Sequence, residues 1–276
     1  MYKILILLAL SVSAYAKPVV PTVPASHVLY EYETHSYYVK ENVDQVRPIA
    51  SITKLFTAIT VIRSGVNLDE KVKVQGKTYG HFPRNTMPSR IDLLRAVMIS
   101  SDNLAAESLA MAHPGGYDQF LTDVNLYIKS LKLKNTVIVD PTGLGIGNVS
   151  TVNDLIEVLT NIKNNPVIKN ISNEKHAKIQ VAKGKKTITI NLNNTNPQIF
   201  VYNNILISKT GFTNPAGRCL ALLIEKNGIQ FAVIILGQKD VRARSKIVDM
   251  LMSVPVLPRE PEPPPPAVVV DYNMFF

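Results

Sequence analysis

The sequence predicts an α/β protein of the α+β kind: an antiparallel sheet formed from both ends of the chain, flanked by helices, with a helical subdomain inserted. Strand-like segments occur near the start, over residues 28–40, and again over residues 205–236. Between them, apolar residues recur at helical spacing. The chain has 276 residues, of which 46% are apolar, so it can bury a substantial core.

The N-terminal residues have the order of a secretory signal peptide. A short basic start, Met1–Lys3, precedes an apolar run and the small-residue site Ala14-Tyr15-Ala16. Cleavage after Ala16 is predicted, so residues 1–16 are a signal peptide and residues 17–25 a Pro-rich leader linker. The apolar run is shorter than the roughly 20 residues that cross a bilayer. We therefore expect an exported, periplasmic protein with no stable membrane anchor.

The first strand-like segment should form a hairpin that turns at residues 34–36, where polar residues interrupt the strand pattern. Next, Ile52, Leu55, Phe56, Ile59 and Ile62 repeat at helical spacing and end at Gly65, a usual helix stop. The glycine-bearing segment 137–151 is predicted to be a loop. Further helices are expected at residues 91–99, 104–112, 117–131 and 152–162.

The C-terminal part of the chain changes to strands. We expect them at residues 205–210, 219–225 and 229–236, the last two joined by the hairpin signal Asn227-Gly228, and a final helix at 241–252. The domain is expected to span residues 26–257. Residues 258–276 form a Pro-rich tail that should be extended and suits docking of a protein partner.

Charge and cysteine content narrow the function classes. The formal net charge is +9, and removal of the signal peptide with Lys3 leaves +8. The densest basic stretch, Lys175–Lys186, has no aromatic residue to stack on bases, so we expect a solvated loop or hairpin and no nucleic acid. A carboxylate-bearing extracellular polymer is an acceptable partner. The single cysteine, Cys219, excludes an intrachain disulfide, and we expect neither a cofactor nor a metal.

Two strings place a serine three residues before a lysine. Ser51 and Lys54 lie at the start of an apolar helix, where burial would lower the pKa of the lysine and let it act as a base. The second pair, Ser172 and Lys175, lies in a polar stretch that should be exposed and inert. The five histidines are scattered and fit no catalytic string. A serine nucleophile with a lysine base is therefore favoured at Ser51.

Two companion strings follow in order: Ser101-Asp102-Asn103, and Lys209-Thr210-Gly211 at the end of a strand. The ordered set is the signature of serine penicillin-recognising enzymes. The chain resembles the low-molecular-mass D-alanyl-D-alanine carboxypeptidase and endopeptidase family, and most of all its soluble endopeptidase branch. The similar segments are 50–55, 100–106, 113–117, 140–144, 148–151 and 209–219.

The resemblance implies a β-lactamase/DD-peptidase-like fold and a set of residue roles. Ser51 would be the acylated nucleophile and Lys54 its base, while Ser101 would pass a proton to the leaving amine. Asn103 would contact the substrate backbone. The remaining implied residues are Lys209 and Thr210 for the substrate carboxylate, Gly211 for close approach of the strand, and the N–H groups of Ser51 and Phe212 for the oxyanion hole.

The implied activity is a serine D-alanyl-D-alanine peptidase that acts on peptidoglycan cross-links or on terminal D-alanine, and that binds β-lactams. A class A-like β-lactamase is one alternative, but between Tyr127 and Ile156 there is no glutamate to activate a water, and Glu157 falls in a predicted helix. Another alternative is a catalytically weak cell-wall-binding protein. Arg218 either adds positive charge near the site or is an ordinary surface residue.

Overall fold

A computed structural model describes residues 25–255 of the chain. The signal peptide predicted at residues 1–16, nearly all of the leader linker at residues 17–25 and the Pro-rich tail at residues 258–276 lie outside the described residues. Within residues 25–255, no helix is both long enough and apolar enough to cross a membrane.

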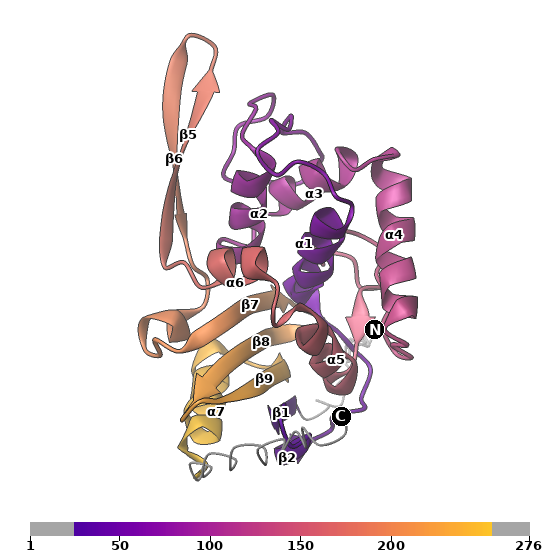
Figure 1. Ribbon diagram of the computed structural model, residues 1–276, viewed down its shortest axis with the longest axis vertical. Helices are drawn as coiled ribbons and strands as arrows, with labels where there is room; N and C mark the ends of the chain where they lie inside the picture. Colours follow the sequence, from indigo (N-terminus) through magenta and orange to yellow (C-terminus); the bar gives the residue numbers. More distant parts are fainter. Residues whose placement is uncertain (1–24, 256–276) are drawn as a thin grey trace, which may run out of the picture.

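Five antiparallel strands form the main sheet, in the order β2-β1-β9-β8-β7. Strand β1 (Ser26–Glu31) pairs with β2 (Ser36–Glu41) on one side and with β9 (Ile229–Gln238) on the other. Strand β8 (Gly217–Lys226) lies between β9 and β7 (Ile205–Thr213). The two ends of the described chain therefore build one sheet, as the sequence predicts (Figure 1).

Both predicted hairpin turns are present, and each uses residues that tolerate a left-handed backbone. His35, with φ +55°, lies in the turn between β1 and β2. Asn227 and Gly228, with φ +54° and +77°, form the two-residue connection between β8 and β9. Two successive positive φ values are typical of the turn whose twist matches that of the flanking strands.

The predicted helices are confirmed, with small shifts at their ends. They lie between the two sets of strands in sequence, and α7 follows the last strand. Their bounds are η1 Ala50–Thr53, α1 Lys54–Arg63, α2 Arg90–Ile99, α3 Asn103–Met111, α4 Gly116–Ser130, α5 Val152–Ile162 and α7 Val241–Ser253.

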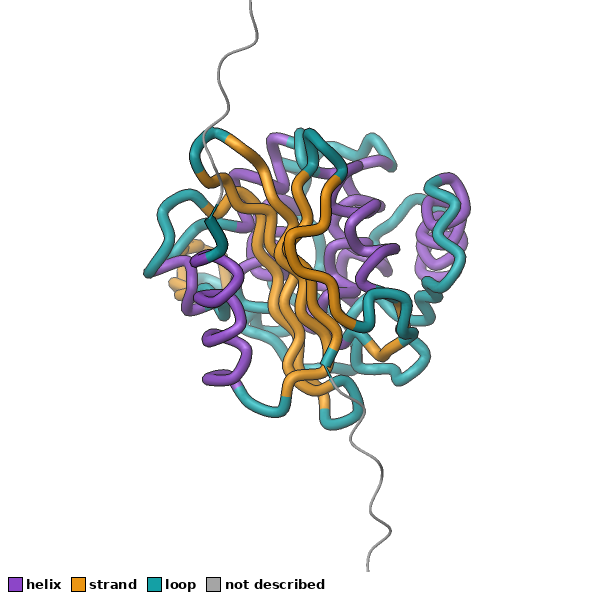
Figure 2. The backbone as a smooth tube through the Cα atoms, turned by 90° about the horizontal axis from the view of Figure 1, so that it is seen from below, coloured by secondary structure: helices purple, strands orange, loops and turns teal. Residues whose placement is uncertain are grey.

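The sheet is covered on both faces, with helices on either side of the strands (Figure 2). Along β8 the side chains alternate: Leu220, Leu222 and Ile224 pack in a core with α7, whereas Cys219, Ala221 and Leu223 pack in the larger core shared with the other helices. This period of two explains why nearly all of β8 is apolar, since a strand buried on both faces needs no polar side.

Four short elements were not predicted, because they contain too few residues for a periodic pattern. Helix α6 begins after Asn165, whose side chain caps it, and has a proline at its first position, a start signal that the sequence does contain. The four elements are α6 Pro166–Ser172, η2 Pro197–Phe200, β3 Arg47–Pro48 and β4 Val149–Ser150.

The prediction that the second Ser-x-x-Lys string is exposed is wrong for its serine. Ser172 is completely buried, because it follows Ile168 by one helical turn on the face of α6 that packs inward. Lys175 lies beyond the end of this helix and is exposed. No hydrogen bond joins the two side chains, so this string does not form a serine–lysine pair.

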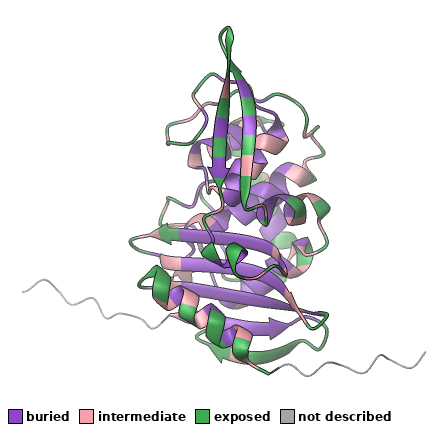
Figure 3. Ribbon diagram, turned by 90° about the vertical axis from the view of Figure 1, so that its left-hand side faces the viewer, coloured by how far each residue is buried: buried purple, intermediate pink, exposed green. Residues whose placement is uncertain are grey.

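The basic stretch predicted as a loop or hairpin is a two-stranded hairpin, which we call the arm (residues 175–193). It consists of β5 (His176–Lys183) and β6 (Lys186–Asn193), paired antiparallel. The arm projects beyond the rest of the molecule (Figure 1), and its buried and exposed residues alternate along each strand (Figure 3).

A glycine in the loop 137–147 determines how closely that loop approaches Ser51. Gly143 has φ +81°, and a Cβ added to it would lie 2.0 Å from the carbonyl oxygen of Ala50. Gly65 has a similar φ of +71° but nothing within 4 Å of an added Cβ. The two positions thus share the backbone conformation and differ in the surrounding space.

We predict that Gly143→Ala lowers the free energy of unfolding by roughly 1–3 kcal/mol more than Gly65→Ala, because only the first adds a clash to the cost of positive φ. Urea unfolding of both variants measures this difference. Equal losses would show that the loop moves away from Ala50 without cost.

Candidate active site

A cleft of about 330 Å³ lies where the first helical turn, the α2–α3 connection and strand β7 meet. Six of the eight predicted site residues line it: Ser51, Ser101, Asn103, Thr210, Gly211 and Phe212. The other two, Lys54 and Lys209, have exposures of 0% and 1% and contact the cleft residues from beneath. The structure therefore brings all eight residues together.

Ser51 lies in the 3-10 turn η1, one turn before α1 begins at Lys54. Its side chain caps no helix; instead its Oγ lies 3.0 Å from Lys54 Nζ and 3.4 Å from the carbonyl oxygen of Thr142. The Ser51 hydroxyl is therefore directed at the lysine, and an ordinary helix-capping role is excluded.

Three oxygen atoms surround the amine of Lys54. Besides Ser51 Oγ, Nζ contacts Asn103 Oδ1 at 2.7 Å and the Thr142 carbonyl oxygen at 2.6 Å. An amide oxygen and a carbonyl oxygen can only accept hydrogen bonds, so a neutral amine gives them its two protons. Its lone pair is then left facing Ser51 Oγ, the hydroxyl of which can donate.

Burial favours that neutral form. Desolvation lowers the pKa of Lys54 to about 7, although the charges of Asp102 and Asp140 act in the opposite direction. No ion pair involving Lys54 occurs within residues 25–255. A large fraction of the amine is thus unprotonated near neutral pH, which a lysine needs to accept a proton from serine.

Backbone strain and close packing hold Ser51 in place. Ala50 has φ +47°, an uncommon value for a residue with a side chain. On the other side, a Cβ added to Gly211 would lie 2.9 Å from the backbone nitrogen of Ser51. Only a glycine in β7 therefore lets the strand lie this close to the N–H of Ser51.

Ser101 occupies the opposite side of the cleft, also in a strained conformation, with φ +55°. Its Oγ accepts a hydrogen bond from Lys209 Nζ at 2.9 Å. The next residue, Asp102, caps α3 by accepting from the backbone N–H of Ala105, and this fixes where Asn103 begins the helix. Because Asn103 gives its oxygen to Lys54, its side-chain N–H groups can donate to a molecule in the cleft.

Lys209 is buried near two other basic side chains. Burial, Lys54 and Arg244 together lower the pKa of Lys209 well below its usual value. Its amine donates to Ser101 Oγ and to the carbonyl oxygen of Thr210. No carboxylate within residues 25–255 pairs with Lys209. An anion that enters the cleft would therefore favour the protonated form of Lys209.

Arg244 is a cleft residue that sequence reasoning missed. It comes from α7, is only 4% exposed, and its Nε finds no hydrogen-bond partner within the described residues, while Nη1 donates to the carbonyl oxygen of Cys219. Arg218, considered from the sequence, also lines the cleft and lies 3.7 Å from the centre of the Phe212 ring. No local motif marks Arg244, since only the packing of α7 on the sheet brings it here.

Thr142 is a second residue that was missed, because it acts through its carbonyl oxygen. The loop that contains Thr142 is organised by Asp140, whose carboxylate accepts hydrogen bonds from the N–H groups of Thr142, Gly143 and Gly145. Burial alone would raise the pKa of Asp140, but these hydrogen bonds outweigh it and lower the pKa. The loop is thus a rigid support that aims one carbonyl oxygen at Lys54.

Histidine and metal chemistry find no support at this cleft. His113 is buried and pairs with Asp123, and His81 pairs with Asp102. No histidine bonds to Ser51 within residues 25–255. In the same part of the chain, no three His, Cys, Asp or Glu side chains are grouped as metal ligands.

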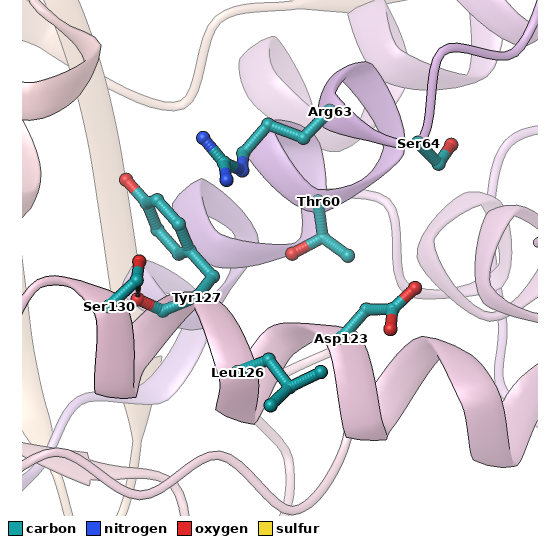
Figure 4. Close-up of a pocket in the computed structure, with 7 residues that line it drawn as sticks. All are labelled: Thr60, Arg63, Ser64, Asp123, Leu126, Tyr127 and Ser130. Carbon is teal, nitrogen blue, oxygen red and sulfur yellow. Dashed lines mark hydrogen bonds between the residues drawn. The ribbon is translucent and has the colours of Figure 1, made fainter.

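A separate cavity of about 340 Å³ lies between α1 and α4, lined by residues such as Thr60, Arg63 and Tyr127 (Figure 4). None of the eight predicted residues belongs to it. Here the Arg63 guanidinium lies 5.2 Å from the centre of the Tyr127 ring. Within residues 25–255, the predicted site residues thus lie at the cleft beside β7 and not at this cavity.

Relatives with known names match most of this chain. Residues 14–240 match the D-alanyl-D-alanine carboxypeptidase family of peptidases. Over 219 residues, the chain is 37% identical to a D-alanyl-D-alanine endopeptidase of Escherichia coli, covering 76% of this chain and 70% of that protein. A D-alanyl-D-alanine endopeptidase of Pseudomonas aeruginosa is 36% identical with the same coverage.

Solved structures give the same fold. A Streptomyces DD-transpeptidase superposes with a TM-score of 0.77 at 23% identity, covering 86% of this chain and 97% of its own. Penicillin-binding protein D2 of Listeria monocytogenes, in an ampicillin-bound form, gives 0.73 at 26% identity, covering 82% and 94%. With these folds and the family match, the chain belongs to the D-alanyl-D-alanine carboxypeptidase family of serine peptidases.

Proposed function

We propose that this DD-peptidase hydrolyses D-alanyl peptide bonds of peptidoglycan through an acyl-enzyme on Ser51. The observation that carries the proposal is the buried amine of Lys54, whose Nζ lies 3.0 Å from Ser51 Oγ and contacts two oxygens that can only accept hydrogen bonds. Family membership supplies the substrate class, and the relatives named D-alanyl-D-alanine endopeptidase and carboxypeptidase supply the reaction.

In the proposed first step, Ser51 Oγ attacks the carbonyl carbon while its proton moves to Lys54 Nζ. The C–N bond of the substrate then breaks, and the proton taken up by Lys54 passes by way of the Ser101 hydroxyl, whose Oγ is bonded to Lys209, to the leaving amine. Attack of water on the Ser51 ester releases the new carboxylate and restores the serine. The Ser51–Lys54 and Ser101–Lys209 pairs on which these transfers depend are both within hydrogen-bonding distance.

The negative charge that develops on the carbonyl oxygen needs two donors. We assign them to the backbone N–H groups of Ser51 and Phe212, which Gly211 allows to approach one another. Because η1 precedes α1, the Ser51 N–H also lies at the positive end of the helix dipole. Both effects favour an oxyanion at this point.

A terminal carboxylate of the substrate is the anion that fits the positive side of the cleft. Lys209, Thr210 and Arg244 would bind it. Thr210 Oγ1 lies 2.6 Å from Thr195 Oγ1 and is thereby oriented. A buried guanidinium with an unused N–H gains a charge-assisted hydrogen bond when a carboxylate enters. The same groups would bind the carboxylate of a β-lactam.

Cross-links are the preferred bonds in this proposal, because both relatives above 30% identity are endopeptidases by name.

The β-lactamase alternative is disfavoured by the loop near Lys54. The carboxylate in this loop, that of Asp140, already accepts hydrogen bonds from the loop backbone and is not available to activate a water. Glu157, the next candidate, is exposed on α5. A long-lived acyl-enzyme with penicillin is therefore expected. Export to the periplasm stays a prediction from the N-terminal sequence.

We predict that a fluorescent penicillin labels Ser172→Ala as it labels the unaltered protein, and that Ser51→Ala abolishes labelling. Gel fluorescence measures this, and the buried Ser172 serves as the matched serine. Labelling of Ser51→Ala would contradict the assignment of the nucleophile, and rapid loss of the label would favour a β-lactamase.

The same preparation separates the two peptidase activities when it is incubated with cross-linked muropeptides and with uncross-linked pentapeptide muropeptides. We expect cleavage of the cross-linked form to be faster, as followed by chromatography of the products. Release of D-alanine alone would contradict the endopeptidase preference, and absence of product from both would contradict the enzyme itself.

We also predict that Arg244→Gln slows acylation by penicillin roughly tenfold to a hundredfold, as expected for loss of a hydrogen bond to a charged group. Arg242→Gln, two residues earlier in α7 and exposed, is the control and should leave the rate unchanged. The rate of labelling at limiting penicillin measures both. An unchanged rate in Arg244→Gln would remove this residue from the carboxylate site.

A further inference from the structure

The arm carries positive charge and no negative charge. Residues 175–193 contain five lysines and no aspartate or glutamate, in a chain whose formal net charge is +9. All five lysines are exposed, and none forms an ion pair within residues 25–255. They are Lys175, Lys178, Lys183, Lys185 and Lys186.

One face of the arm is apolar and packed against the protein, and the other is polar and exposed. On one face Ile179, Val181 and Leu192 are buried against the helical core that includes α2. On the other face Lys178 pairs with Asn191 and Gln180 with Thr189, all exposed. The apolar face holds this two-stranded hairpin in place, since an isolated hairpin is barely stable in water. The polar face is not needed for that purpose.

The base of the arm is bonded to the catalytic cleft. Ser100, the neighbour of Ser101, exchanges two hydrogen bonds with the backbone of Asn193, at 3.0 and 3.1 Å. The backbone N–H of Thr195 donates to the carbonyl oxygen of Ile99, and Thr195 itself lines the cleft. Figure 1 shows the arm projecting from this base. A polymer that lies along the arm would therefore reach the catalytic residues at the base.

We propose that the arm binds carboxylates of polymeric peptidoglycan outside the cleft and so selects the intact network over short peptides. This inference rests on the proposed function. Lysines spread over an exposed strand and its turn suit a ligand whose charges are spaced along a flexible chain, because each contact is a non-directional ion pair. Lys183, Lys185 and Lys186 lie at the turn of the hairpin, with Lys183 opposite Lys186, whereas Lys178 lies farther along β5 and Lys175 just before it. The charges thus extend from the tip of the arm to its base, farther than a single compact anion would reach.

The competing explanation is that the lysines only prevent edge-to-edge association of the arm, a common use of lysine on edge strands. The two explanations differ in what removal of the charges does. Loss of edge protection causes self-association and leaves binding of the polymer unchanged, whereas loss of a binding surface weakens the hold on the polymer at unchanged oligomeric state.

The test combines Lys178→Gln, Lys183→Gln, Lys185→Gln and Lys186→Gln in one arm variant. The control variant removes the same charge elsewhere by Lys73→Gln, Lys129→Gln, Lys132→Gln and Lys134→Gln, all at exposed positions. Sedimentation with insoluble peptidoglycan at low salt measures binding. We expect about tenfold weaker binding by the arm variant, the size expected for a few exposed charge pairs, and little change in the control.

Amidation of the carboxylates of the polymer provides a second measurement. Binding of the unaltered protein to the amidated polymer should fall to the level of the arm variant, and so should its binding to the native polymer at high salt. Equal binding of both variants to native peptidoglycan would overturn the proposal. Arm-dependent binding to vesicles of anionic phospholipid, without an effect on peptidoglycan, would overturn it too.

Cleavage of a soluble cross-linked muropeptide separates this proposal from the one on which it rests. The arm variant should cleave that small substrate as fast as the unaltered protein and cleave insoluble peptidoglycan more slowly. An equal loss on both substrates would contradict selection of the network by the arm. Lack of cleavage by the unaltered protein would instead contradict the peptidase function. The sedimentation assay would then still test whether the arm binds peptidoglycan.

Discussion

Burial of Lys54 without an ion-pair partner is the constraint on which this site depends. An ammonium group removed from water is costly, and the protein compensates by favouring the neutral amine. The surroundings of Nζ then decide what that amine does, because Asn103 and Thr142 accept its two protons and Ser51 is left to donate. A serine and a lysine at this spacing become a nucleophile and its base only in such an environment.

Several parts of the fold serve that one amine. The apolar helix α1 carries Lys54 into the core, and the α2–α3 connection places Asn103 beside it. The loop organised by Asp140 supplies the carbonyl oxygen of Thr142. Strained backbone at Ala50 and Ser101 indicates that the surrounding structure, rather than local preference, fixes both serines. Tertiary packing therefore maintains the backbone conformations that position Ser51 and Ser101.

The elements with regular patterns could be predicted from the sequence, and those that depend on contacts across the fold could not. Helix α5 and the β8–β9 hairpin have strong periodicity or a specific turn dipeptide, whereas α6 is too short to show either. The buried state of Ser172 follows from the packing of α6, so its polar neighbours in sequence were misleading. Arg244 enters the cleft only because α7 packs on β8 and β9, and Thr142 contributes an atom that every residue has.

The protonation state of Lys54 tests the account most directly. In protein labelled with ¹⁵N at the lysine side chains, the resonance of Lys54 Nζ can be followed by NMR as the pH is raised. The account predicts a titration at about pH 7, with the amine charged below that pH and neutral above it. A lysine that keeps its charge up to its ordinary pKa of about 10.4 would contradict the claim that burial makes Lys54 the base.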